Sequence, residues 1–197
     1  MKIKKTYTSI AILLIALIVS CKQNTTFSDF KYTEKPETIT CDNLNSALYK
    51  EALYAFEEDI LAFYGKNEAN PTLMQSYYKF IREANGKRAR YSEIASEHTL
   101  KVFEALKDVN DLWDAKNPNS HLNYHSALMN CVANNIEDEH LKTTLNALIS
   151  TDFMSPKLFA TPLINNYRRV LSDKHLSTYV AFDLYYSNLF NLNKTAH

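Results

Sequence analysis

The sequence predicts an all-α fold, in which about six or seven helices pack as one bundle-like domain. The chain of 197 residues contains only two glycines and five prolines, so few positions interrupt a helix. Apolar residues recur at spacings of three and four along most of the chain, which is the period of an amphipathic helix. Without its first 20 residues the chain keeps about 177, enough for a single domain with a substantial core.

Capping residues and helix breakers divide this body into consecutive helices. Asp42 is a candidate N-cap for the first helix, and Gly65 is a candidate for the residue just beyond its end. Asn70 and Pro71 are suited to open the second helix, which ends at Gly86. The predicted helices span, in chain order, residues 42–64, 71–85, 92–115, 120–136, 141–150, 162–171 and 172–190.

The boundaries in the second half of the chain depend on fewer signals. The third helix carries a long apolar stripe and ends before the Asn-Pro-Asn sequence at 117–119, which breaks helices. Ser120 is the candidate N-cap of the fourth helix. The seventh helix begins at Ser172 or Asp173, and the residues after it are polar.

Charge argues against a nucleic-acid partner. The chain holds 22 basic and 22 acidic side chains, but Lys2, Lys4 and Lys5 belong to the extreme N-terminus. The remaining body is therefore mildly acidic, and it shows no cluster of basic and aromatic residues that would follow a phosphate backbone.

The first 21 residues have the order of parts of an export signal. A cationic stretch at 1–5 precedes an apolar stretch at 10–19, which is too short to cross a bilayer. The small residue Ser20 then precedes Cys21. This order resembles the signal peptide of bacterial lipoproteins, and the resemblance implies cleavage before Cys21 and acylation of its thiol, for example with palmitate. The alternative is a plain secretory signal followed by an incidental cysteine.

These features predict a signal peptide at 1–20, a lipidated polar tether at 21–40 and a helical domain at 41–197. In its low glycine content, its abundance of Asn, Lys and Tyr, and its helix start at Cys41-Asp42, the body resembles small all-helical lipoproteins of flavobacterial type. The resemblance implies a lipid-anchored protein of the bacterial cell envelope, at either the inner or the outer membrane. It carries no activity that could be transferred to this chain.

Two further cysteines, Cys41 and Cys131, remain if Cys21 is acylated. Export places them in an oxidising compartment, where a disulfide is expected. Closing a loop of about 90 residues would stabilise the fold by roughly 4 to 5 kcal/mol. The alternative is two unpaired thiols buried as small apolar side chains.

Several polar residues fall inside the apolar stripes when the helices are drawn at 100° per residue. They are His98, His121, His125, His175, Asp59 and Asp183. Imidazole and carboxylate groups on facing helices can bind a divalent transition metal such as zinc. The alternative is that each histidine is hydrogen-bonded in the core, since an unpaired buried polar group costs about 1 to 3 kcal/mol. In that case we expect His98 to be buried and paired with Asp59 or with an inward residue of the seventh helix.

The chain also contains 13 tyrosines, some of them in adjacent pairs such as Tyr77-Tyr78 and Tyr185-Tyr186. One member of each pair can serve the core while the other faces the surface, where tyrosine favours a protein or glycan partner. No nucleophile elbow and no glycine-rich phosphate loop is present, so no catalytic site is assigned. The sequence therefore predicts a lipid-anchored envelope protein with a binding or scaffolding role. The alternative is a metal-binding or metal-dependent helical protein.

Overall fold

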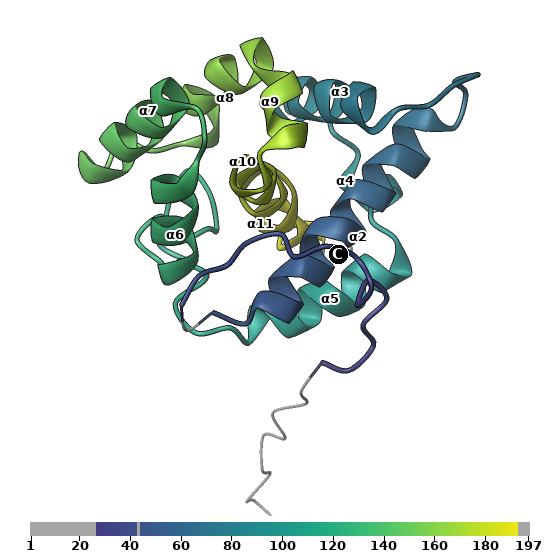
Figure 1. The fold of residues 1–197 in the computed structure, drawn as a ribbon, viewed down its shortest axis with the longest axis horizontal. Coiled ribbons are helices and arrows are strands. Elements are labelled where there is room, and N and C mark those ends of the chain that lie inside the picture. The colour runs from purple at the N-terminus through teal and green to yellow at the C-terminus, as the bar shows by residue number, and fades with distance from the viewer. Residues whose placement is uncertain (1–26, 43, 193–197) are drawn as a thin grey trace, which may run out of the picture.

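The computed structural model describes residues 27–42 and 44–192, so the predicted signal peptide and Cys21 lie outside the described residues. The described chain is all-helical, as predicted (Figure 1). Its only β-type pairing, within the described residues, is an isolated antiparallel bridge between Trp113 and Leu122. None of the helices in these ranges has the length and apolar character needed to cross a membrane.

The first two helices begin where a side chain caps them. Helix α2 (Ser46–Gly65) starts at Asn45, whose side chain accepts a hydrogen bond from the Leu48 backbone N–H, and so begins later than the predicted cap at Asp42. Helix α3 (Leu73–Asn85) is capped by Thr72, and it ends at Gly86 as predicted. The two helices pack through aromatic rings, with Phe56 5.6 Å from Tyr77 between ring centroids.

The predicted third helix, 92–115, is wrong in extent because the chain breaks within it. Helix α4 (Tyr91–Ile94) and helix α5 (Glu97–Lys107) are separated by an extended Ala95, and Ser96 caps α5. The backbone N–H of Ser96 also donates to the buried carboxylate of Asp59, 3.1 Å away, which holds the break in place.

The fourth helix is also shorter than predicted. Helix α6 (Ala127–Asn135) is capped by Ser126, and no helix begins at Ser120, whose hydroxyl donates to Asp183 and accepts from the Leu122 backbone N–H. Residues 108–126 therefore form a long non-helical connection. Its backbone turns through a left-handed Asp111, with φ of 65°.

The next three helices are helix α7 (Glu139–Ser150), helix α8 (Pro156–Asn165) and helix α9 (Tyr167–Ser172). The predicted helix 162–171 thus corresponds to two helices, and α8 begins well before Pro162, at a cap provided by Ser155. Helices α3, α7 and α9 all pack against α8.

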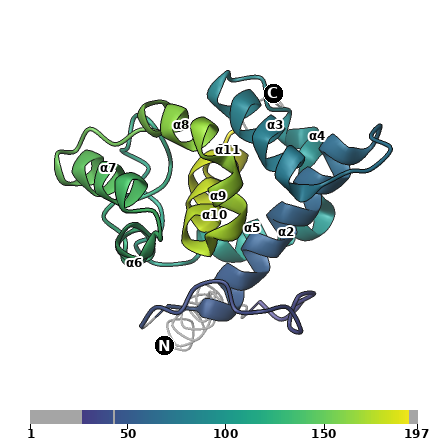
Figure 2. The ribbon, with the colours of Figure 1, turned by 45° about the horizontal axis from the view of Figure 1, so that its top comes forward.

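A continuous helical run at the C-terminal end forms the centre of the domain (Figures 1 and 2). It consists of helix α10 (Lys174–Tyr179), the π-helix η2 (Val180–Tyr186) and helix α11 (Ser187–Leu189). Every residue from Leu176 to Ser187 is buried, because α2, α3, α4 and α6 pack around this run. Tyr185 and Tyr186 are both buried, so the prediction that one of this pair faces the surface is wrong.

The segment before α2 belongs to the domain. Glu51 of α2 accepts hydrogen bonds from the backbone N–H groups of Lys31, at 2.6 Å, and Tyr32, at 3.1 Å. Tyr32 and Ile39 are buried against the body. The predicted tether at 21–40 is therefore held to the domain over part of its length, through Tyr32, Thr38 and Ile39, and residues 21–26 lie outside the described ranges.

Cys41 and Cys131 form the predicted disulfide, with their Cα atoms 6.1 Å apart. The bond ties the chain just before α2 to the middle of α6. It thereby links two parts of the domain that are far apart in sequence.

Candidate functional site

The six residues predicted to bind a metal do not come together. His98 of α5 places its Nε2 2.7 Å from Oε1 of Glu51, and its Nδ1 4.0 Å from Oδ2 of Asp29. The partner is thus an acid of the first helix, but Glu51 rather than the expected Asp59. Asp59 accepts instead from the Tyr185 hydroxyl, at 2.7 Å.

His98 is half-buried, with 17% of its side chain exposed, and not buried as predicted. The fully buried neighbour Thr99 lies nearer the centre of the inward face of α5. His98 therefore lies at the edge of the inward face of α5, and not at its middle as predicted.

The other three histidines lie apart. His125 is exposed, and its Nε2 is 2.9 Å from Oδ1 of Asp152. It does not face the core as predicted, because residues 120–126 are not helical. The ring of His121 packs on Phe190, with centroids 4.7 Å apart. His175 is half-buried in the first turn of α10, where burial lowers its pKa.

No group of three or more His, Cys, Asp and Glu side chains in the described ranges is arranged to hold a metal ion. The single site predicted from the inward histidines is therefore not assembled by these residues.

Of the six predicted residues, Asp183 is the most deeply buried. Its carboxylate is fully buried on η2 and accepts hydrogen bonds from three hydroxyls, those of Ser120 at 2.6 Å, Tyr179 at 2.7 Å and Tyr124 at 3.1 Å. Burial raises the pKa of Asp183 to about 6, although the three hydroxyl donors oppose that rise. The carboxylate therefore fastens the 120–124 segment to the central helical run.

This attachment fixes a loop immediately before it. The side-chain oxygen of Asn117 accepts from the backbone N–H groups of Asn119, at 3.0 Å, and Ser120, at 3.3 Å. The side-chain nitrogen of Asn117 donates to the Leu122 carbonyl, at 2.9 Å. Both neighbours of Pro118 are thus held, and Pro118 and Asn119 border a surface pocket.

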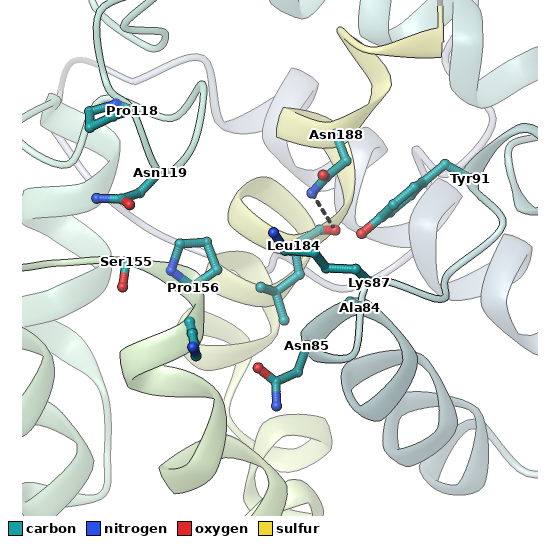
Figure 3. Close-up of a pocket in the computed structure, with 11 residues that line it drawn as sticks. Ala84, Asn85, Lys87, Tyr91, Pro118, Asn119, Ser155, Pro156, Leu184 and Asn188 are labelled. Atoms are coloured by element: carbon teal, nitrogen blue, oxygen red, sulfur yellow. Dashed lines mark hydrogen bonds between the residues drawn. The ribbon is translucent and has the colours of Figure 1, made fainter. Parts of the chain in front are cut away.

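The pocket has a volume of about 310 Å³ and is formed where several segments meet. They are the C-terminal end of α3, the start of α4, the loop at 118–119, the N-terminal end of α8, and the end of the central run. In Figure 3, Pro118 and Asn119 lie on one side of the pocket and Tyr91 on the opposite side, with its hydroxyl directed inward. Asn188 donates to the Leu184 carbonyl at 3.1 Å, and this bond forms part of the pocket wall.

Five polar side chains of the pocket make no hydrogen bond or ion pair with another described residue: Asn85, Lys87, Tyr91, Asn119 and Lys157. No Asp or Glu is among the lining residues. Burial raises the pKa of Tyr91 above its ordinary value, so its hydroxyl stays protonated and can donate. Tyr91 is partly buried and the other four residues are exposed, so the pocket presents two ammonium groups, two amides and one hydroxyl to solvent or to a ligand.

Lys87 also has an uncommon backbone conformation. Its φ is 54°, in the left-handed region, and it follows Gly86 at the end of α3. The turn is closed by hydrogen bonds from the Lys87 N–H to the Ala84 carbonyl, at 3.0 Å, and from the Arg88 N–H to the Glu83 carbonyl, at 2.8 Å. The left-handed conformation is unfavourable for a residue that has a Cβ atom, and residues in such conformations are often found at functional sites.

The sequence does not predict this pocket, because hydrophobic periodicity places residues on helix faces, whereas the pocket is formed by helix ends and a loop. The Asn-Pro-Asn sequence at 117–119 and the Gly86-Lys87 pair were visible as breakers. Nothing in their spacing shows that they meet in space.

Comparison with protein-family models, curated proteins and solved structures gave no match.

Proposed function

We propose that this protein is a lipid-anchored component of a bacterial cell envelope with a binding role, and that the pocket beside Lys87 and Tyr91 is its binding site. The anchor is proposed from the order of charged, apolar and small residues before Cys21. The binding role is proposed from the pocket, which combines a concave shape with polar groups that no described residue pairs.

The position of the N-terminal segment relates the proposed anchor to the proposed binding pocket. In Figure 2, residues 27–42 run along the bottom of the domain, whereas α3, α4 and α8, which contribute to the pocket, lie in its upper half. An anchor attached ahead of residue 27 would therefore leave the pocket facing away from the bilayer. That orientation favours binding of an envelope protein or glycan over binding of the membrane itself. The alternative of a metal-binding protein gains no support from the arrangement of the described histidines.

The anchor is tested by metabolic labelling with a fatty acid analogue. We expect wild-type protein to carry the label and to sediment with membranes, and Cys21→Ser to lose both properties, because a single thiol supplies the attachment atom. Phe27→Ala leaves that thiol in place and serves as a matched control that should remain labelled. A labelled Cys21→Ser protein, or an unlabelled wild type, would contradict the assignment.

A further inference from the structure

We propose that the pocket binds a small sugar acid, that is, a saccharide unit carrying a carboxylate. This inference rests on the binding role proposed above, and it names the chemistry of the ligand from the groups that the pocket presents.

Charge is the first argument. Lys87 and Lys157 contribute two ammonium groups, and neither has an acidic partner among the described residues. A neighbouring depression, which His125 and Asn123 line, contains both Asp114 and Asp152. Of these two, the pocket beside Lys87 is the one suited to an anion, because a carboxylate near an ammonium group forms a charge-assisted hydrogen bond.

The buried carboxylate of Asp183 does not pair with these lysines, because its oxygens accept hydrogen bonds from Ser120, Tyr124 and Tyr179. The positive groups of the pocket therefore remain available to a ligand.

Hydrogen-bonding capacity is the second argument. The amides of Asn85 and Asn119 each both donate and accept, and Tyr91 adds a hydroxyl. Inorganic phosphate has at most two hydroxyl donors near neutral pH, and an apolar ligand would cover these groups without offering them any hydrogen-bond partner. Sugar hydroxyls donate and accept as the amides do, so a polyhydroxylated anion matches the whole set.

Size and shape are the third argument. A volume of about 310 Å³ lies at the low end of ligand pockets, which suits about one or two sugar rings. In Figure 3 the Lys87 side chain extends from the right side of the pocket toward its middle, in front of Leu184. The left-handed backbone of Lys87 sets the direction from which this ammonium group enters.

The experiment uses the full chain in detergent micelles, with ¹⁵N chemical shifts followed during titration with D-glucuronate. We expect saturable shifts confined to the pocket, and much weaker binding of D-glucose and of inorganic phosphate. Lys87→Gln should weaken glucuronate binding about tenfold and Tyr91→Phe about threefold to tenfold, since each removes one polar contact while keeping most of the side chain. Lys66→Gln, which removes an exposed lysine outside the pocket, should bind as the wild type does.

Three results would overturn the inference. The first is the absence of saturable shifts with glucuronate, and the second is an equal loss of affinity in Lys87→Gln and Lys66→Gln. The third is equal binding of inorganic phosphate, because the pocket would then recognise charge alone. A tetrasaccharide ending in glucuronate separates a chain end from a free sugar acid, and tighter binding of either form supports the proposal. Fatty acid labelling of the same preparation reports the anchor independently, so a failed titration of acylated protein counts only against the ligand class.

Discussion

At the scale of single residues, buried carboxylates organise this domain. Asp183 receives three hydroxyls, Asp59 receives Tyr185 and the Ser96 backbone, and Glu51 receives two backbone N–H groups and His98. Helical periodicity predicted the inward positions of Asp59 and Asp183, which are both buried. It did not predict their partners, because a hydroxyl or backbone N–H that reaches a carboxylate from a distant segment leaves no periodic signal.

We predict that Asp183 makes stability fall as pH rises. Its pKa is about 3.9 in an unfolded chain, and burial raises it to about 6 in the folded protein, so the folded state binds the proton more tightly. The favourable contribution is complete below about pH 4 and is lost as pH rises through about 6, a change of about 3 kcal/mol. Asp183→Asn removes this dependence, so the variant should gain roughly 2 kcal/mol on the wild type between pH 4 and 7 in urea unfolding.

Asp138→Asn is a control of opposite sign. Asp138 caps α7, and the Leu141 backbone N–H lowers its pKa, so its contribution is present above the unfolded pKa and is lost as pH falls through the folded one. This variant should therefore gain on the wild type as pH decreases toward 3. A stability difference between Asp183→Asn and wild type that stays constant over pH 4 to 7 would contradict the assignment.

At the scale of secondary-structure elements, helix boundaries were predicted correctly where one strong local signal is present. They were predicted wrongly where several residues could cap the same helix. Gly86 ends α3 as expected, because nothing nearby offers another stop. In the stretch 92–126, by contrast, several serines could cap, and the choice among them depends on distant acids. Ser96 donates its N–H to Asp59, 37 residues away, and Ser120 its hydroxyl to Asp183, 63 residues away. The sequence around each serine carries no information about these partners.

The packing of the N-terminal segment gives a prediction about an element. Glu51 is almost fully buried and holds the backbone of residues 31 and 32, so Glu51→Gln replaces an acceptor-only group with one that presents an N–H to the same donors. We expect the amides of Lys31 and Tyr32 to exchange hydrogen at least about tenfold faster, and the domain to lose roughly 2 kcal/mol. Hydrogen exchange followed by mass spectrometry measures the first effect, and urea unfolding the second.

The matched variant is Glu58→Gln. Glu58 binds the same segment through Lys31 Nζ and the Tyr32 hydroxyl, but its side chain is 53% exposed. A solvent-exposed pair of this kind contributes less than about 1 kcal/mol, so this variant should leave the segment protected. If the two variants raised exchange equally, the buried carboxylate would not be what holds the segment.

At the scale of the whole molecule, the all-helical class and the disulfide followed from composition and cysteine number. The pocket could not be predicted, because it forms where the end of α3, the 118–119 loop, the start of α8 and the central run meet. These segments come together because the other helices pack around the central helical run on all sides. The run from Leu176 to Ser187 is buried even at Asp183, Tyr185 and Tyr186, which an amphipathic pattern would partly assign to solvent.

The Cys41–Cys131 bond should contribute to the stability of the whole domain. It closes a loop with a sequence separation of 90 residues, and the chain-entropy relation gives about 4 to 5 kcal/mol for a loop of this length. We predict that the double variant Cys41→Ser/Cys131→Ser loses about 4 kcal/mol in urea unfolding and matches the reduced wild type. Cys21→Ser, which leaves the bond intact, should keep the full difference between oxidised and reduced protein. An unfolding midpoint of the double variant equal to that of the oxidised wild type would show that α6 and the start of α2 are held by packing alone.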